Sequence, residues 1–322
     1  MTAAPQNRSR IIVAFALLYV LWGSTYLAMR VIVRDMPPYV AGTVRYLIAG
    51  PIMLVACALL GRKIRLTRRD LGQLLVISIL LLSTGNIGVL WGEEYVSSGL
   101  ASLIVALVPI WVVMFEAWVF RAGRMTAKGL IGLAIGIVGL LVLLWPRITA
   151  GTHLGRLELL GAGILAGASF LWALGSIFSH RFNLTIDVFV SAAWQMTLAG
   201  SVNGVIALLT GQFQKTHWTH SALSGIGYLV VFGSWIGYSA YIYLLEHVPT
   251  PKVATYAYVN PIVAVFLGWI ILREQVDIFM LLGTAIIIAS VALVNTSRLK
   301  QAPVDLQVSD ETCPKTVNVS GD

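Results

Sequence analysis

Charged residues are scarce in this sequence, and their scarcity defines the class of protein. Asp, Glu, Lys and Arg make up 11% of the 322 residues, and hydrophobic residues make up 58%. Soluble globular proteins carry roughly 25% charged and about 45 to 50% apolar residues. Together with a mean hydropathy of +0.84, these values predict a membrane protein. Ten helical spans of about 20 residues each would leave too little chain for a separate catalytic domain.

Cysteines and catalytic motifs are also lacking. Cys57 lies in an apolar segment and Cys313 in the polar C-terminal tail, with no spacing typical of a disulfide or a metal site. We therefore expect no disulfide, no metal and no cofactor. His-Glu-x-x-His, Gly-x-Ser-x-Gly, P-loop and Cys-x-x-Cys motifs are missing too. Since no His, Asp or Cys cluster shares a membrane depth, the sequence disfavours an enzyme.

Basic residues nevertheless exceed acidic ones by 22 to 14. Such an excess can indicate nucleic-acid binding, but in a membrane protein it more often reflects cytoplasmic loops that follow the positive-inside rule. We therefore expect the lipid bilayer and a small-molecule substrate as partners, and no nucleic acid. The sequence leaves open whether the protein is a monomer or a homodimer.

Ten apolar segments joined by short polar links predict an all-α membrane protein with ten transmembrane helices. The segments lie at about residues 11–33, 38–60, 71–92, 97–120, 127–145, 157–179, 186–210, 222–245, 251–272 and 278–296. The first is too long for a signal-peptide core and has no small-residue cleavage site, so we interpret it as a retained span.

The orientation follows from the Lys and Arg residues. With the N-terminus inside, fifteen of them lie on the inner side and five on the outer side, while Arg30 and Arg45 fall within spans. Both termini are then cytoplasmic in a multi-pass protein of the bacterial inner membrane. Residues 1–10 form a short cytoplasmic N-terminus, and residues 301–322 form a polar tail that we expect to be disordered.

The two halves of the sequence resemble each other. Shifts of 152 and 150 residues superpose, respectively, Glu94, Pro109 and Arg121 on Glu246, Pro261 and Arg273, and Trp22 on Trp172. Residues 11–145 and 157–296 therefore form two repeats of five helices. Because five is odd, the second repeat enters the membrane from the opposite side. Secondary transporters use such inverted repeats and bind substrate near the midplane between them.

Several motifs resemble the EamA family of the drug/metabolite transporter superfamily, in particular its drug/metabolite exporter subgroup. They are Trp22-Gly23-Ser24-Thr25, Arg45, Glu93-Glu94-Tyr95-Val96-Ser97-Ser98-Gly99-Leu100-Ala101, Pro109, Asn260-Pro261 and Leu272-Arg273-Glu274. The resemblance covers about residues 11–296 and implies a ten-helix inner-membrane carrier with a central cavity and, usually, an export role. The Gly-Glu expected after the fourth helix of each half is Arg273-Glu274 in the second half and Arg121-Ala122 in the first.

Charged residues in or near the spans are candidate gate residues, because a charge in a span costs about 2.5 to 3.5 kcal/mol at the centre. Arg30, Arg45 and Glu116 lie within spans, where pairing at the membrane interface is the simpler interpretation. The repeat suggests a sharper hypothesis, in which two clusters close the carrier alternately. The outer cluster comprises Arg30, Arg45 and Glu94, and the inner cluster His180, Arg181 and Glu246.

The acidic residues are placed unfavourably for proton coupling. All fourteen fall in loops, tails or near helix ends, whereas proton-coupled carriers commonly need a titratable group that alternates between faces. Facilitated export or exchange therefore fits better than drug-cation/proton antiport. A phosphorylated-sugar or nucleotide-type anion exchanger is an alternative, because Arg45 is suited to bind phosphate, and a channel is another.

Aromatic and amide side chains near mid-depth are the candidate substrate-binding residues, since they combine apolar area with oriented polar groups. These are Trp22, Asn86, Trp172, Trp235, Tyr238, Tyr256 and Asn260, with helix packing or lipid contact as the alternative. Pro109 and Pro261 interrupt their helices at matching depth and are candidate hinges, or else static kinks. Gly132-x-x-x-Gly136 and Gly163-x-x-x-Gly167 match the pattern of closely packed membrane helices.

The predicted topology can be tested by labelling. Single cysteines placed in residues 62–69 and in residues 212–220 should react with a membrane-impermeant reagent from opposite faces of the membrane, because the positive-inside count puts the first loop inside and the second outside. Labelling of both loops from one common face would contradict the inverted repeat.

Overall fold

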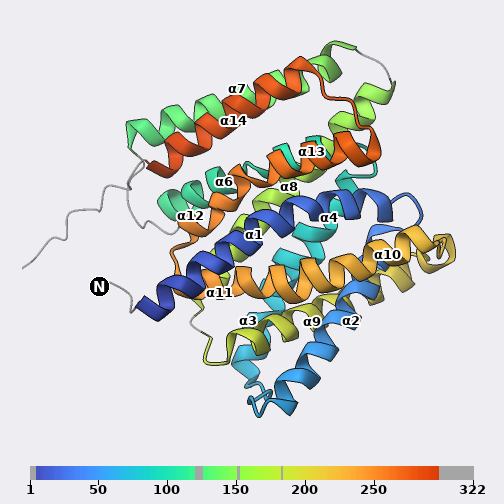
Figure 1. The fold of residues 1–322 in the computed structure, drawn as a ribbon, viewed down its shortest axis with the longest axis vertical. Coiled ribbons are helices and arrows are strands. Elements are labelled where there is room, and N and C mark those ends of the chain that lie inside the picture. Colours follow the sequence, from blue (N-terminus) through green and yellow to red (C-terminus); the bar gives the residue numbers. More distant parts are fainter. Residues whose placement is uncertain (1–4, 120–125, 151–152, 183, 297–322) are drawn as a thin grey trace, which may run out of the picture.

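The computed structural model describes residues 5–119, 126–150, 153–182 and 184–296, and all regular structure within these ranges is helical (Figure 1). The predicted tail at 301–322, Arg121 and Ala122 lie outside the described residues. The elements are α1 (Pro5–Ile32), α2 (Pro38–Leu59), α3 (Arg68–Ser78), η1 (Ile79–Asn86), α4 (Ile87–Gly92), α5 (Ser98–Val105), α6 (Val108–Met114), η2 (Phe115–Val119), α7 (Ala127–Ala150), α8 (His153–Arg181), α9 (Val188–Leu209), η3 (Phe213–Lys215), α10 (His220–Tyr228), η4 (Leu229–Tyr238), α11 (Ser239–His247), α12 (Thr250–Val253), η5 (Ala254–Tyr258), α13 (Asn260–Leu272) and α14 (Ile278–Thr296).

Nine helical stretches in the described ranges are long and apolar enough to cross a membrane. They coincide with the first nine predicted segments, from Ser9–Ile32 to Thr250–Leu272. The tenth segment corresponds to α14, whose apolar part, Ile278–Leu293, is shorter than the other nine. An all-α membrane protein is therefore confirmed, with α14 packed along α7 (Figure 1).

Four of the spans change helix type within the bundle. The third and eighth contain the π-helices η1 and η4, which start at Ile79 and Leu229, 150 residues apart as in the repeat (229 − 79 = 150). The fourth and ninth break just before α6 and α13, which carry Pro109 and Pro261 in their first turn. Proline is common in the first turn of a helix, because the N–H group that it lacks would have no intrahelical partner there.

Glycines bring the two halves into contact. A Cβ atom on Gly50 would lie 2.4 Å from Thr197 Oγ1, and one on Gly200 would lie 2.9 Å from the Leu47 backbone N, so α2 and α9 pack closely. Gly283 contacts Leu143 in the same way, which joins α14 to α7. Figure 1 shows both pairs side by side at opposite edges of the molecule. In each pair the partners occupy equivalent positions in the two halves.

The central helices are α1 and α8, the first span of each half. α1 packs on α10, η4 and α11 of the eighth span and on α13 of the ninth, while α8 packs on η1 and α4 of the third span and on α6 of the fourth. Each contact of α1 thus has a counterpart for α8 when the halves are exchanged. This arrangement places one face of α1 and one face of α8 at the middle of the bundle.

The two Gly-x-x-x-Gly motifs differ in their surroundings. Ser290 of α14 donates a hydrogen bond to the Gly132 carbonyl at 2.6 Å, and a Cβ atom on Gly136 would lie 2.6 Å from Ser290 Oγ. Added Cβ atoms on Gly163 and Gly167 would meet nothing within 4 Å. The expected close packing therefore holds for the first motif and is wrong for the second, which faces away from the bundle.

Gly50→Ala should destabilise the protein. The added methyl group would lie 2.6 Å from the backbone N of Thr197, and overpacking of this kind typically costs about 1 to 3 kcal/mol. We expect Gly163→Ala, the matched control, to leave the stability unchanged or raise it by up to about 1 kcal/mol through helix propensity. Thermal unfolding in detergent measures both, and equal stability of the two variants would contradict the packing described here.

Candidate functional site

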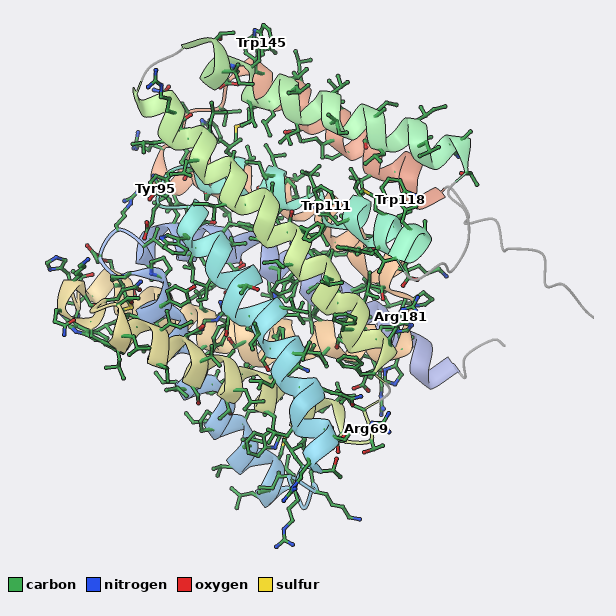
Figure 2. All side chains as sticks on the ribbon, turned by 180° about the vertical axis from the view of Figure 1, so that it is seen from behind. Arg69, Tyr95, Trp111, Trp118, Trp145 and Arg181 are labelled. Carbon is green, nitrogen blue, oxygen red and sulfur yellow. The ribbon has the colours of Figure 1, made fainter. Side chains whose placement is uncertain are left out.

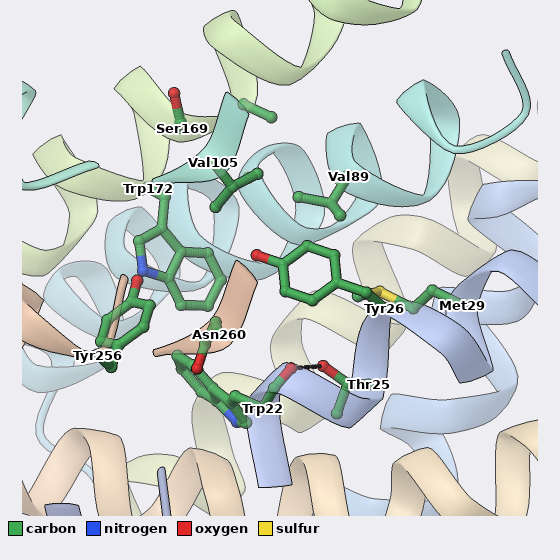
Figure 3. A pocket seen from close by; sticks show the side chains of 12 residues that line it. Trp22, Thr25, Tyr26, Met29, Val89, Val105, Ser169, Trp172, Tyr256 and Asn260 are labelled. Carbon is green, nitrogen blue, oxygen red and sulfur yellow. Dashed lines mark hydrogen bonds between the residues drawn. The ribbon is translucent and has the colours of Figure 1, made fainter. Parts of the chain in front are cut away.

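A small cavity lies where the central helices meet. It has a volume of about 50 Å³ and is lined by residues of α1, the third and fourth spans, α8 and the ninth span (Figure 3). These residues are Trp22, Thr25, Tyr26, Met29, Gly85, Val89, Val105, Ala168, Ser169, Trp172, Tyr256 and Asn260. Helix breaks after Val105 and before Asn260 lie at the cavity wall, where irregular backbone is tolerated in a membrane protein.

Aromatic rings form much of the cavity wall. Trp22 of α1 and Trp172 of α8, which are equivalent in the repeat, meet edge-on with ring centroids 5.5 Å apart. Trp22 also meets Tyr256 of η5 edge-on at 5.3 Å and Tyr241 of α11 at 4.8 Å. Trp172 Nε1 donates a hydrogen bond to the Tyr241 hydroxyl at 3.0 Å. The cluster presents aromatic faces and edges, which favour flat apolar groups.

Asn260 is a polar residue of the cavity whose side-chain oxygen has no hydrogen-bond partner among the described residues. Its side chain is buried, and its Oδ1 atom accepts no hydrogen bond from the described residues. By contrast, Thr25 and Ser169 donate to carbonyls of their own helices at 2.7 and 2.8 Å. Figure 3 shows Asn260 on the same side of the cavity as Trp22 and Tyr256. A buried unpaired acceptor is costly, so this amide is suited to a ligand donor.

The cavity is smaller than an ordinary substrate site. Sites for small molecules usually measure about 300 to 1,000 Å³, whereas this one, at about 50 Å³, is too small for a metabolite. The aromatic side chains therefore fill most of the space between the central helices.

Three residues predicted to line the cavity lie elsewhere. Trp235 lines a separate groove of about 640 Å³ together with Arg10 and Arg62, and its Nε1 atom donates to the Ala49 carbonyl at 3.0 Å. Asn86 and Tyr238 do not line the cavity and belong to a polar network beside it. Of the seven predicted residues, the structure brings four to the cavity, namely Trp22, Trp172, Tyr256 and Asn260.

The polar network beside the cavity is organised around Arg45, which is 5% exposed. Arg45 donates from Nε to Ser234 Oγ at 2.8 Å and from Nη1 to Asn86 Oδ1 at 3.1 Å. Tyr46 donates to the same Asn86 oxygen at 2.7 Å, and the Arg45 guanidinium carbon lies 4.9 Å from the Tyr46 ring centroid. These contacts hold the Arg45 cation within the bundle, and none of the partners named here is a carboxylate.

The same network repeats in the second half. Tyr238 donates to Gln195 Oε1 at 2.5 Å, and these residues correspond to Asn86 (86 + 152 = 238) and Arg45 (45 + 150 = 195). The second and third spans are thus joined to each other as the seventh and eighth are. Ser234 was not recognised in the sequence, because a serine in an apolar helix carries no distinguishing pattern.

At the end of the bundle that the sequence predicts to face outward, the contacts differ from the predicted cluster. Arg30 Nη1 donates to the main-chain carbonyl of Glu93, and Arg45 lies with Ser234 and Asn86 instead. Glu94, expected to pair with both arginines, is exposed. The outer cluster is therefore not formed, because Glu94 points away from the bundle and its neighbour Glu93 points into it.

Glu274 links two spans at the same end of the bundle as Arg30. Its carboxylate accepts hydrogen bonds from Ser98 N at 3.0 Å, Ser98 Oγ at 2.8 Å and Gly99 N at 3.3 Å. The first turn of α5 has unpaired N–H groups and a positive dipole end, both of which a carboxylate satisfies. Glu274 therefore joins the end of the ninth span to the start of the fourth, a contact that needs no paired glutamate in the first half.

At the opposite end, predicted to face the cytoplasm, His180 and Arg181 make contacts between helices, but not with Glu246. His180 Nδ1 donates to the Leu245 carbonyl at 2.5 Å, and Arg181 forms an ion pair with Glu116 at 2.7 Å. Glu246 is exposed. The expected inner cluster is therefore replaced by one in which Glu116 takes the place of Glu246. Figure 2 shows Arg181 and Arg69 toward one side of the bundle and Tyr95 toward the other.

Comparison with known proteins gives consistent matches along the chain. The sequence model of the EamA-like transporter family matches twice, over residues 9–145 and 159–296. The uncharacterized inner membrane transporter YedA of Escherichia coli K12 is 34% identical over 283 residues, which cover 87% of this chain and 89% of YedA. The uncharacterized transporter YvbV of Bacillus subtilis is 25% identical over 320 residues, covering 97% and 99%.

The fold is also similar to that of a protein solved by crystallography. It aligns with a TM-score of 0.66 over 88% of this chain and 96% of its own, at 18% sequence identity. At that identity the likeness concerns the fold alone.

Asn86 should stabilise the protein through Arg45. Loss of a hydrogen bond to a buried charged group costs about 1.5 to 3 kcal/mol, so Asn86→Leu should lower the free energy of unfolding by that amount. In an Arg45→Met background the same substitution should cost less, because only the Tyr46 hydroxyl then loses its hydrogen-bond partner. A double-mutant cycle by denaturation in detergent measures the coupling, and additive effects would contradict the network.

Proposed function

The chain belongs to the EamA-like transporter family, and on that premise we propose that it is a secondary transporter that exports small amphipathic metabolites across the inner membrane by alternating access. Amino acids, aromatic compounds and drugs are the substrate classes considered. The single observation that carries this proposal is the central cavity, whose lining combines the aromatic rings of Trp22, Trp172 and Tyr256 with the Asn260 amide oxygen, which is unpaired among the described residues.

The chemistry of the cavity supports this substrate class. Trp22, Trp172 and Tyr256 offer a stacking surface for a ring or a flat apolar group. Asn260 Oδ1 offers an acceptor for an N–H or O–H donor on the substrate. Since no carboxylate or basic side chain is among the lining residues, the site favours a solute held by shape, stacking and one oriented hydrogen bond.

Closure at both ends supports alternating access over a channel. Arg30 and Glu274 close the outer end, while His180 and Arg181 close the inner end, and the cavity lies between them. Rocking of the halves about the breaks before Pro109 and Pro261 would open one end at a time. We propose these prolines as the hinges and place both termini in the cytoplasm, in a monomer or a homodimer.

The position of Arg45 bears on the alternative of a phosphorylated-sugar or nucleotide-type exchanger. Arg45 is not among the residues that line the cavity, and its Nε and Nη1 atoms already donate to Ser234 and Asn86. A cation held in this way stabilises the contact between spans rather than facing a substrate. An amphipathic substrate without a phosphate therefore agrees better with the geometry.

Proteoliposome counterflow tests the proposal. With a panel of amino acids, aromatic metabolites and cationic dyes, we expect saturable exchange of at least one compound. Asn260→Ala and Trp22→Ala should reduce its apparent affinity about tenfold, as expected for the loss of about 1.4 kcal/mol of binding energy.

Trp145→Ala is the matched control, because Trp145 is 52% exposed near the end of α7 (Figure 2). It should leave exchange unchanged. Equal effects of all three substitutions would contradict the cavity assignment, and a flux that rises linearly with concentration would favour a channel.

A further inference from the structure

Glu93 is an acidic residue in an apolar, fully buried position. It directly follows α4, and its side chain is 0% exposed. Neither carboxyl oxygen has a hydrogen-bond partner among the described residues. Val89, one helical turn earlier, lines the central cavity. Glu93 therefore lies between the cavity and the outer end of the bundle, in the contact that we call the outer gate: Arg30 donating to the Glu93 carbonyl.

No neighbouring group neutralises this carboxyl through a hydrogen bond. The Arg30 guanidinium donates to the main-chain oxygen of Glu93 rather than to its side chain, and Glu274 is a second acid, engaged with α5. From α8, the apolar Leu165 packs against the adjacent Gly92. The titratable and charged groups around the site are Tyr26 and Arg30 of α1, Glu274 beyond α13, and Tyr39 of α2, which packs on Trp91.

The second half of the protein contains an internal comparison for this position. His180 donates to the Leu245 carbonyl just as Arg30 donates to that of Glu93, and the pairs are equivalent in the repeat (30 + 150 = 180 and 93 + 152 = 245). The equivalent of Glu93 is thus a leucine, also 0% exposed. In both halves this position is closed off from water. A carboxyl group is stable in such a position only when it is uncharged.

The electrostatics of the site agree with this comparison. Burial raises the pKa of the Glu93 carboxyl well above its ordinary range, Arg30 opposes the shift, and Glu274 adds to it. Burial is the largest of the three causes. If a carboxyl group is protonated when buried and ionised when hydrated, the equilibrium between its buried and hydrated states depends on pH.

We propose that Glu93 is a proton-binding site of the outer gate, protonated while that gate is closed and ionised, with release of the proton to the outside water, when it opens. The inference rests on the proposed function, because a gate that opens and closes presupposes a carrier. It also revises the argument against proton coupling: Glu93 lies in a short loop in sequence, but the fold buries it next to the substrate cavity.

The direction of the pH effect follows from the two pKa values. The open gate hydrates Glu93 and returns its pKa to the ordinary value of about 4.3, whereas the closed gate holds the pKa above it. The preference for the closed gate that protonation of Glu93 provides is therefore at its maximum when the pH is below the ordinary pKa of the carboxyl group. This preference is lost progressively as pH rises toward the closed-state pKa, by up to about tenfold per pH unit.

Labelling from the outside tests the proposal. The parent protein carries Cys57→Ser, Cys313→Ser and Val89→Cys, so that a membrane-impermeant maleimide reaches the cavity only through an open outer gate. Rates measured between pH 5.5 and 7.5 are divided by those of Gln214→Cys, an exposed loop position that corrects for thiol ionisation. We expect the relative rate of the parent to rise with pH, and that of Glu93→Gln and Glu93→Leu to stay low and constant.

Glu94→Gln is the matched control, since it removes the adjacent, exposed carboxylate, and it should keep the pH dependence of the parent. Infrared difference spectra between the same pH values should show a protonated-carboxyl band that is lost in Glu93→Gln and kept in Glu94→Gln. An unchanged pH dependence in Glu93→Gln, or a flat response in the parent, would overturn the proton site.

Counterflow by the wild-type protein, which keeps Val89 in the cavity, separates the two proposals. Exchange that persists while labelling stays independent of pH would remove the proton site and leave the carrier function intact. The absence of any saturable exchange would contradict the proposed function itself.

Discussion

The structure depends on one constraint of the bilayer: a polar group inside the bundle cannot bind bulk water and must be satisfied by protein. Arg45 illustrates the usual solution, with Ser234 and Asn86 as hydrogen-bond partners and Tyr46 against its guanidinium. Buried polar groups without a hydrogen-bond partner are therefore candidates for a functional role. Asn260 and Glu93 have such atoms at the cavity and at the outer gate. Asn203, Gln212 and Thr250 also have such atoms, but none of these residues lines the cavity.

Duplication explains how the same contacts close both ends. Arg30 and His180 are equivalent residues that donate to equivalent carbonyls, those of Glu93 and Leu245. In an inverted arrangement, one such contact belongs to each face of the membrane. The two gates then share a geometry and differ in chemistry, since only the outer one carries a titratable side chain at the buried position. That difference gives the proposed cycle a direction in which external pH acts.

Four of the seven residues predicted from the sequence line the cavity, and the residues that do not line it were misplaced for a common reason. Trp22, Trp172, Tyr256 and Asn260 were identified because the repeat and the helical period place them at one depth and on inward faces. Trp235 is of the same residue type as Trp22 and Trp172 and lies at a similar predicted depth, yet it lines a different groove. Periodicity gives the depth of a residue to within a turn, whereas the face that meets the cavity depends on how the helices pack. The π-helices and breaks within four spans change that face locally.

The sequence by itself determined that this is an all-α membrane protein of the EamA family with two similar halves, because apolar composition, span length and the repeat are properties of the chain alone. The tertiary structure decided which of two adjacent glutamates enters the gate. Glu93 and Glu94 are chemically identical neighbours, and one is buried while the other is exposed. Only the packing of α1, α8 and the loop beyond α13 around the end of α4 distinguishes them, since burial depends on contacts between residues far apart in the chain.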